Sequence, residues 1–266
     1  MTTATISAPA RARDVLASEW IKLRSVRSTY LVLLFAAAAA VGIGYLVAHA
    51  KATHWATMPA AERAAFDPVS DSYTGLGLAQ LAFGALGVLM ISSEYTTGLI
   101  RTTFAAVPRR RAVIAAKAAV VGAVTLLAGE LIAFATFFTG QQALSAQHLN
   151  VTLAHHGALR GVLAAGFYLA MMAWVGLGLG AVIRHTAGAI TAMVGLVFLL
   201  PTVIHALPAP WDTRIGRLTL DGAAQQMIAQ HPHAGYFSAG VSFLVVAAYA
   251  VAAIAAAAFV ITRRDA

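Results

Sequence analysis

The sequence predicts an all-α integral membrane protein with six transmembrane helices, an interfacial helix at its N-terminus and a short cytoplasmic helix. Of its 266 residues, 60% are hydrophobic and 11% are charged, and the mean hydropathy is +0.77. A soluble domain carries about a quarter charged residues, so this chain has too little polar surface to cover a water-soluble globule. Its charged residues also leave six long apolar gaps, each near the ~20 residues that a spanning helix needs.

The six predicted spans form one transmembrane domain, which is flanked by two cytoplasmic segments. Residues 1–28 form a cytoplasmic N-terminal segment, residues 29–262 form the transmembrane domain, and residues 263–266 form a cytoplasmic tail. Continuous runs rich in Ala and Leu favour helices, because the strands of a membrane barrel alternate in polarity and are about 10 residues long. The predicted spans cover residues 30–50, 75–93, 112–138, 160–183, 187–207 and 237–261.

Charged residues mark the ends of the first three predicted spans, which are taken here in chain order. The first span is uncharged from Ser28 to Ala50, and the second lies between Asp71 and Glu94. The third begins after the arginines at 109–111 and contains Lys117 near that end. Because a charge at mid-bilayer costs several kcal/mol, such residues are expected at the ends of spans or in functional positions.

The last three spans are bounded in the same way. The fourth follows Arg160 and ends before Arg184, and the fifth begins near residue 187. The region 222–262 is uncharged, but the segment His231-Pro232-His233 interrupts it, so only its second part is predicted to span. Glycines at 84, 87, 176, 178 and 180 suit close helix packing, although glycine is also simply common in such helices.

Lysine and arginine predict the orientation. One side of the predicted topology carries thirteen of them: Arg11, Arg13, Lys22, Arg24, Arg27, Arg101, Arg109, Arg110, Arg111, Lys117, Arg184, Arg263 and Arg264. The other side carries five: Lys51, Arg63, Arg160, Arg214 and Arg217. The positive-inside rule places the larger set in the cytoplasm, facing anionic lipid rather than nucleic acid. Both termini are then cytoplasmic, and the chain is expected to be a multi-pass protein of the inner (cytoplasmic) cell membrane.

Residues 14–27 are predicted to form an amphipathic helix on the inner leaflet. Five apolar residues would fall within an arc of about 140° on a helix. Glu19 intrudes on this arc, whereas Lys22 faces away from it. Trp20 is expected at the level of the lipid headgroups. The alternative is a cluster of charges that only sets the topology.

A second amphipathic helix is predicted within residues 94–108. Gly98 can end the second span, and Pro108 disfavours helix at the residue before it. Arg101 and Thr102 would project from one side of the short helix. Three apolar residues recur at a helical spacing and would form the other side: Ile100, Phe104 and Val107. Such a helix suits docking in the groove of a partner, and a plain positive-inside loop is the alternative.

Two of these segments resemble motifs of the permease subunit of type-2 ABC transporters, and the actinobacterial members are the most similar. The first motif is Glu19-Trp-x-Lys-Leu-Arg-Ser-x-Arg-Ser-Thr-Tyr30, before the first span. The second is Ser93-Glu-Tyr-Thr-Thr-Gly-x-Ile-Arg-Thr-Thr-x-Ala-Ala-Val-Pro-Arg-Arg110, after the second span. The segment Trp211-x-x-Arg-Ile-Gly-x-x-Thr-Leu-x-Gly-Ala-Ala-Gln-Gln-Met227 resembles the last external loop of that family. Ser93 departs from the pattern, because glycine is frequent there.

The resemblance implies an elbow helix, a coupling helix and partner chains. Two permease copies, identical or related, would form a dimer with separate ABC ATP-binding subunits, and ATP would be bound by these subunits and not by this chain. The turn at 184–186 would be a second contact point, and export of lipid-like or drug-like molecules is implied. The implied elbow residues are Glu19, Trp20, Lys22, Leu23 and Arg24. The implied coupling residues are Glu94, Tyr95, Gly98, Arg101, Thr102, Phe104, Pro108 and Arg109.

No catalytic motif is found, so the chain is predicted to be a transport subunit and not an enzyme. No Gly is followed by Lys, which excludes a Walker-A loop, and no His is followed by Glu, which excludes zincin-type proteases. There is no Gly-x-Ser-x-Gly elbow and no cysteine. An ATP-independent, ion-coupled carrier or a membrane scaffold is the alternative of a different class.

Glu130, inside the third span, is the candidate functional residue within the membrane. An intramembrane carboxylate can contact cargo, carry a proton or form a hydrogen bond between helices. A purely structural carboxylate, bonded to a neighbouring helix, is the alternative. Eight of the nine histidines are predicted at the outer face, where they could bind metal or sense pH: His49, His54, His148, His155, His156, His205, His231 and His233. No carboxylate-rich ligand set accompanies them, so no metal site is predicted.

Overall fold

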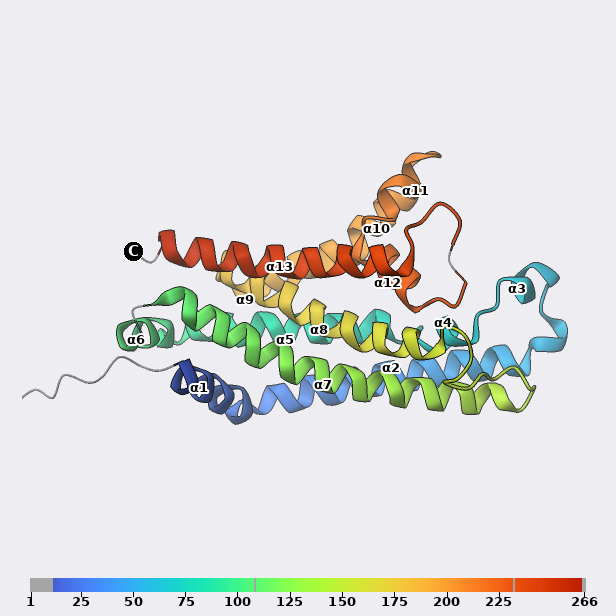
Figure 1. Ribbon diagram of the computed structural model, residues 1–266, viewed down its shortest axis with the longest axis horizontal. Coiled ribbons are helices and arrows are strands. Elements are labelled where there is room, and N and C mark those ends of the chain that lie inside the picture. The colour runs from blue at the N-terminus through green and yellow to red at the C-terminus, as the bar shows by residue number, and fades with distance from the viewer. Residues whose placement is uncertain (1–11, 108, 232, 265–266) are drawn as a thin grey trace, which may run out of the picture.

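The protein is a bundle of long helices (Figure 1). The computed structural model describes residues 12–107, 109–231 and 233–264. Six helical segments in these ranges are long and apolar enough to cross a membrane, and no strand occurs in them. This confirms the all-α prediction and the number of spans. The six are α2 (Arg27–Thr53), α5 (Leu76–Thr96), α7 (Arg110–Ser145), α8 (Ala158–Ile183), the segment Thr186–His205, and α13 (Ala239–Arg264).

The third spanning helix, α7, is longer than the span predicted at 112–138. It has 36 residues, and its last two turns pack on the short helix α4 (Pro68–Ser72). A Cβ atom at Gly140 would lie 2.4 Å from Ser72 Oγ, so the two helices touch through the glycine. Gln141 Nε2 donates a hydrogen bond to the carbonyl of Pro68 at 2.9 Å. These contacts explain why the helix continues through polar residues that a hydropathy pattern reads as its end.

The fifth spanning segment is not a uniform α-helix. It consists of α9 (Thr186–Val194), the π-helical turn η2 (Gly195–Leu199) and α10 (Leu200–His205). Pro201 lies in the first turn of α10 and has no N–H to donate to the preceding turn. A widened turn before a proline is a common way for a helix to absorb this missing hydrogen bond.

Short helices gather at the two ends of the bundle. One end, here called the α6 end, carries α1 (Ala12–Ser25) and α6 (Leu99–Ala106). The opposite α12 end carries η1 (Trp55–Thr57), α3 (Ala60–Ala64), α4, α11 (Trp211–Gly216) and α12 (Leu220–Ile228). Asp67 begins α4, because its Oδ1 accepts hydrogen bonds from the backbone N–H groups of Val69 and Ser70, both at 3.0 Å.

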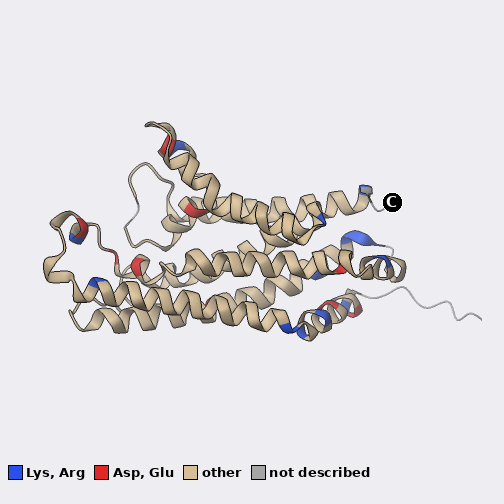
Figure 2. Ribbon diagram, turned by 180° about the vertical axis from the view of Figure 1, so that it is seen from behind, with Lys and Arg blue, Asp and Glu red and all other residues tan. Residues whose placement is uncertain are grey.

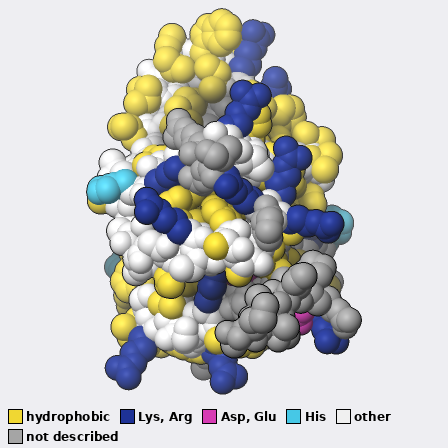
Figure 3. Space-filling model, turned by 90° about the vertical axis from the view of Figure 1, so that its left-hand side faces the viewer, with side chains coloured by type: hydrophobic (Ala, Val, Ile, Leu, Met, Phe, Trp, Pro, Cys, Tyr) yellow, Lys and Arg dark blue, Asp and Glu magenta, His cyan; other side chains and the backbone are white. Residues whose placement is uncertain are grey.

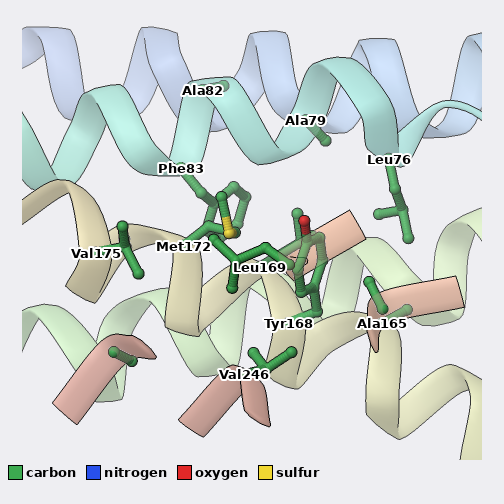
Figure 4. Close-up of a cluster of buried hydrophobic side chains, with 14 of the residues drawn as sticks. Leu76, Ala79, Ala82, Phe83, Ala165, Tyr168, Leu169, Met172, Val175 and Val246 are labelled. Carbon is green, nitrogen blue, oxygen red and sulfur yellow. The ribbon is translucent and has the colours of Figure 1, made fainter. Parts of the chain in front are cut away.

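The core lies around α8, which packs against α5, α7 and α13 (Figure 4). Glycine permits the closest approach, between α5 and α8. A Cβ atom at Gly87 would lie 1.9 Å from the carbonyl oxygen of Ala173, and one at Gly176 would lie 2.0 Å from that of Gly84. The glycines therefore let two backbones touch, as the sequence predicts. In contrast, α2 and α13 expose most of their apolar side chains, which suits a surface covered by lipid.

Charged side chains lie mainly at the two ends of the bundle, and its middle is almost free of them (Figure 2). Viewed end-on, the α6 end presents many Lys and Arg side chains with little acidic surface between them (Figure 3). Arg24, Arg101, Arg109, Arg111 and Arg263 are all exposed. The described members of the two basic groups distinguished in the sequence thus lie toward opposite ends of one molecule.

Candidate functional site

Four charged side chains from three helices meet at the α6 end. We call this group the charge cluster: Glu19 and Lys22 on α1, Glu94 on α5, and Lys117 on α7. Glu94 Oε1 accepts from Lys117 Nζ at 2.8 Å and from Lys22 Nζ at 3.0 Å. Glu19 Oε1 accepts from Lys22 Nζ at 2.7 Å, and its Oε2 accepts from Lys117 Nζ. Each ammonium group therefore bridges both carboxylates.

The charge cluster is buried and electrically neutral. The exposed fractions of Glu19, Glu94 and Lys117 are 3%, 5% and 3%, whereas Lys22 reaches the surface. Two carboxylates and two ammonium groups balance, which is the condition under which buried charges are tolerated. Removing one partner of a buried pair leaves an uncompensated charge and costs about 3–5 kcal/mol. The cluster therefore fixes the relative positions of α1, α5 and α7.

Lys22 is the member of the charge cluster nearest to solvent. Partial burial lowers its pKa, but hydrogen bonds and charge attraction from Glu19 and Glu94 outweigh burial, so the pKa is raised above its ordinary value. Its ammonium group also lies 3.4 Å from Thr103 Oγ1 on α6. Lys22 thus remains charged at neutral pH and joins α1 to both α5 and α6.

The helix α1 packs differently from the amphipathic pattern in the sequence. Val15, Glu19 and Leu23 are its buried residues, whereas Trp20 and Leu16 are exposed. The sequence places Lys22 on the polar face, away from the apolar arc, but its ammonium group lies within the charge cluster. Two residues of the predicted apolar arc, Val15 and Leu23, thus pack against the protein, whereas Leu16 and Trp20 face outward. The helix has this orientation because Glu19 pairs with Lys117 of α7.

The helix α6 lies across the end of the bundle with one side against it. Gly98, with φ of 73°, makes the sharp turn between α5 and α6. Ile100 is buried, Phe104 is partly buried, and Arg101 and Thr102 are exposed. Phe104 and Val107 pack against a small cluster formed by Val15, Val113 and Ala116. The helix is therefore seated on α1 and α7 through its apolar side, and its polar side is free to meet another molecule.

The turn between α8 and α9 lies beside the end of α5. Arg184 has φ of 59°, which lets α8 end and the chain turn directly into α9. Its guanidinium group lies 5.0 Å from the centre of the Tyr95 ring. Thr186 Oγ1 donates a hydrogen bond to Ser92 Oγ at 2.8 Å. The two segments that the sequence proposes as contact points are thus neighbours at one end of the molecule.

The structure places the sequence-derived residues in two groups. Trp20, Arg24, Gly98, Arg101, Thr102 and Arg109 lie at the surface, whereas Glu19, Leu23 and Glu94 are buried. Pro108 lies outside the described residues. Glu94 is one of the predicted coupling residues. Its contacts hold α5 to α1 and α7, so in coupling it would act by joining these helices and not by touching a partner protein.

Lys117 is the site residue that sequence reasoning missed. The sequence alone shows Lys117 only as a charged residue near one end of the third predicted span. The available signal was its position one turn or more inside an apolar helix, where an ammonium group requires a carboxylate. Which carboxylate it meets depends on the packing of α1 and α5, and the linear sequence does not contain that information.

Glu130 lies beside Gly166 of α8, on the flank of the bundle. A Cβ atom at Gly166 would lie 2.4 Å from the Glu130 carboxyl carbon, so glycine makes room for the carboxylate. Its Oε2 is shielded and has no hydrogen-bond partner among the described residues. The carboxylate borders an apolar groove of about 640 Å³ between α7, α8 and α13, to which Leu163 and Phe243 also contribute. The shielded oxygen contacts no donor on a neighbouring helix within the described residues, and a functional role for Glu130 stays a prediction.

The α12 end carries no metal-binding arrangement within the described part of the chain. No group of three or more His, Asp or Glu side chains there could hold a metal ion. His155 and His156 lie in the loop before α8, and His231 and His233 lie in the loop before α13.

No protein-family model matches the sequence, and no curated protein matches it. The function must therefore be inferred from the charge cluster, α6 and Glu130.

Proposed function

We propose that the protein is the membrane-spanning permease subunit of an ATP-driven ABC transporter, and that it exports its cargo. The observation that carries this proposal is the seating of α6. This short helix presents Arg101 and Thr102 at the surface while its other side rests on α1 and α7. A helix so placed can receive a push from a partner and pass it to the bundle. The resemblance of its sequence to the coupling segment of type-2 ABC permeases points the same way.

The mechanism follows from how α6 is connected. A separate ATP-binding subunit would dock on the polar side of α6 and move when it closes on ATP. Gly98 joins α6 to α5 directly, and Lys22 joins it to the charge cluster through Thr103. Because Glu94 and Lys117 are paired at 2.8 Å, α5 and α7 would tilt together rather than separately. Repeated tilting would expose the transport path alternately to the two sides of the membrane.

A second permease copy would complete the path. The apolar residues on the outer faces of α2 and α9 support this part of the proposal. Leu31 and Phe35 of α2 are more than half exposed, and they border a groove of about 370 Å³ shared with α5 and α9. An apolar groove running along three spans suits close contact with another set of helices.

Co-purification tests the proposal directly. The tagged full-length chain, isolated from its native membrane, should carry an ATP-binding protein with a Walker-A loop and should show ATP hydrolysis. The Arg101→Glu variant should lose most of this partner, because charge reversal replaces a charge-assisted contact by repulsion. Phe104→Ala should weaken the association by unseating α6.

Arg111→Ala is the matched control, since Arg111 is an exposed arginine on the first turn of α7 and lies outside α6. It should leave the partner and the hydrolysis unchanged. Normal recovery of the ATPase with both the Arg101 and the Phe104 variants would mean that α6 does not couple the two proteins. A complete lack of any ATP-binding partner would contradict the proposal.

A proton- or ion-coupled carrier is the second candidate function, and Glu130 is the observation that favours it. A carboxylate oxygen that has no hydrogen-bond partner among the described residues, and that lies on a spanning helix beside a groove, can bind and release a proton. Glu130→Gln removes the charge and keeps the shape. In vesicles containing the chain alone, proton uptake that is present in wild type and lost in Glu130→Gln would favour this candidate over the ATP-driven one.

A further inference from the structure

A cleft of about 630 Å³ opens at the α12 end, on the opposite end of the molecule from α6. It lies between α4, the first turns of α5, the first half of α8 at Tyr168 and the helix α12. The residues that carry the argument come from all four elements: Asp67, Asp71, Gln80, Tyr168 and Asp221. Neither the coupling proposal nor the Glu130 candidate involves this cleft.

The cleft has a buried polar floor. Gln80 and Tyr168 are 4% and 3% exposed, and the Tyr168 hydroxyl donates a hydrogen bond to Gln80 Oε1. Figure 4 shows Tyr168 rising from α8 toward α5 among the core side chains. Gln80 Nε2 donates to the carbonyl of Gly77 at 3.1 Å. A second N–H of this amide and the oxygen of Tyr168 keep further hydrogen-bonding capacity.

The charges around the cleft do not balance. Asp71 is paired with Lys51 at 2.6 Å, and within the described ranges this is the one ion pair made by the three carboxylates of the cleft. Asp67 caps α4 and accepts a hydrogen bond from the Gln230 N–H at 2.7 Å, and Asp221 accepts one from Gln225. These donors are neutral. The three carboxylates therefore share a single cationic partner, Lys51, among the described ion pairs.

Two oxygens at the cleft are also left without partners. Asp71 Oδ2 and Ser70 Oγ are shielded, and neither has a hydrogen-bond partner in the part of the chain that the structure describes. The other carboxylate oxygen of Asp71 is the one that Lys51 contacts. A shielded carboxylate oxygen that lacks a donor is costly, and a donor supplied by a bound molecule would remove that cost.

The residues that line the walls of the cleft indicate which kind of cation it could bind. They include the side chains of Phe66, Tyr73, Leu76 and Ile228, which are aromatic or aliphatic. The acidic residues do not converge as a metal-ligand set would. We propose that this cleft binds a small organic cation, with its ammonium group at the carboxylates of Asp71 and Asp221 and its apolar part against the aromatic walls. The ammonium group would then supply both a hydrogen-bond donor and a positive charge to the carboxylates, and the apolar part would cover the apolar walls.

Binding of a size-matched series tests the proposal. The probe is phenethylammonium, with 2-phenylethanol as the neutral analogue and phenylacetate as the anionic one. Heats of binding are measured by titration calorimetry on the full-length chain in nanodiscs of zwitterionic lipid, and empty nanodiscs are subtracted. The ammonium compound should bind at least tenfold more tightly than the alcohol, and the carboxylate should not bind. This measurement needs no ATP-binding subunit, so it is independent of the proposed function.

Two variants locate the site. Asp221→Asn should weaken phenethylammonium binding roughly tenfold, because it removes one charge and keeps the shape. Gly77→Leu should abolish binding, since a Cβ atom at Gly77 meets nothing within 4 Å and the added side chain would occupy the cleft. Their matched controls are Asp212→Asn, in the first turn of α11, and Gly42→Leu, an equally open glycine on α2.

The outcomes separate clearly. Both control variants should bind the probe as wild type does, and the melting temperature of each variant shows whether it is folded. Equal affinity for phenethylammonium and 2-phenylethanol would overturn the proposal. Unchanged affinity in folded Asp221→Asn and folded Gly77→Leu would overturn it as well. If one of these two variants does not fold, the other decides.

Discussion

The ammonium nitrogen of Lys117, on α7, lies 2.8 Å from Oε1 of Glu94, near the end of α5. The same oxygen accepts a hydrogen bond from Lys22 of α1 at 3.0 Å. A single carboxylate oxygen, on the residue four positions before the turn at Gly98, thus joins two spanning helices and the N-terminal helix. In the proposed mechanism, a movement of α6 would act on all three helices at this point.

Lys117→Met should destabilise the protein strongly. The substitution keeps the apolar length of the side chain but leaves Glu19 and Glu94 with only Lys22 as a cationic partner. An uncompensated buried charge costs about 3–5 kcal/mol. The measurement is the thermal unfolding of the intact protein in detergent, followed by fluorescence or by size-exclusion.

The double variant Lys117→Met/Glu19→Gln restores the charge balance and should recover part of the lost stability. Arg13→Ala is the control, because Arg13 and Asp14 form a pair whose side chains are 77% and 55% exposed. It should leave the melting temperature unchanged. A double variant less stable than the single one would show that the buried charges do not compensate one another.

Single cysteines test the orientation, and the chain offers a background without any cysteine. Cysteines at Ser18 and Thr102, at the α6 end, should resist an impermeant thiol reagent in intact cells. Cysteines at Thr57 and Ser145, at the α12 end, should react. All four side chains are exposed, so access within the protein does not limit the reaction. Labelling of Thr102→Cys from outside would reverse the orientation and remove the basis for an intracellular ATPase partner.

Gly87→Ala should reduce stability far more than glycine-to-alanine changes elsewhere in the bundle. The new methyl group would lie 1.9 Å from the carbonyl oxygen of Ala173, so α5 and α8 must separate along their contact. At Gly166 the same change meets the end of the Glu130 side chain, which can rotate away. At Gly42 it meets nothing within 4 Å. The melting temperatures should therefore fall in the order Gly42→Ala, Gly166→Ala, Gly87→Ala, and equal values would contradict the packing described.

Affinity of the α12-end cleft for phenethylammonium should fall as the pH is lowered, starting above the range in which an exposed aspartate titrates. Burial raises the pKa of Asp221, and the nearby His205 and the hydrogen bond from Gln225 offset this only partly. Burial likewise raises the pKa of Asp71, despite its pairing with Lys51. Because a raised pKa means protonation at a higher pH, the negative charge that attracts the ligand is lost early. Calorimetric titrations at several pH values measure this.

Other titratable groups face the same cleft: Asp67, His231, His233 and the phenols of Tyr73 and Tyr168. Asp221→Asn separates the contributions, because it removes one carboxylate and keeps both histidines. Its profile should be shallower than that of wild type, and identical profiles would exclude Asp221 as the titrating group.

The spans could be predicted from the sequence because a charge inside a bilayer is so costly. The span predicted at 75–93, in the gap between Asp71 and Glu94, lies almost entirely within α5 (Leu76–Thr96), which continues past Glu94 to the turn at Gly98. The end of α7 was placed too early, because contacts of Gly140 and Gln141 with α4 hold the last turns in helix. The widened turn before Pro201 was missed, because a proline alone does not say how the missing hydrogen bond is absorbed.

The candidate site was harder to predict than the spans. The apolar side of α6 follows from local periodicity, and Gly98 follows from the need for a turn. The meeting of Glu19, Glu94 and Lys117 does not, because these residues are separated by 98 and 23 positions and come together only when three helices pack. For the same reason the cleft around Asp221 has no local signal: each wall comes from a different part of the chain.

The length of α7 has a consequence for where solutes first meet the protein. At 1.5 Å per residue, its 36 residues extend for about 54 Å, whereas the hydrocarbon of a bilayer is about 30 Å thick. With Arg110 and Arg111 held at one headgroup layer, Gly140 lies about 45 Å farther along the helix, beyond the hydrocarbon on the other side. The helix α4 packs there and carries Asp67 and Asp71 with it. With this placement, the Asp67 and Asp71 side of the cleft would lie beyond the hydrocarbon, where dissolved cations could reach it from water, while Gln80 and Tyr168 form its floor within α5 and α8.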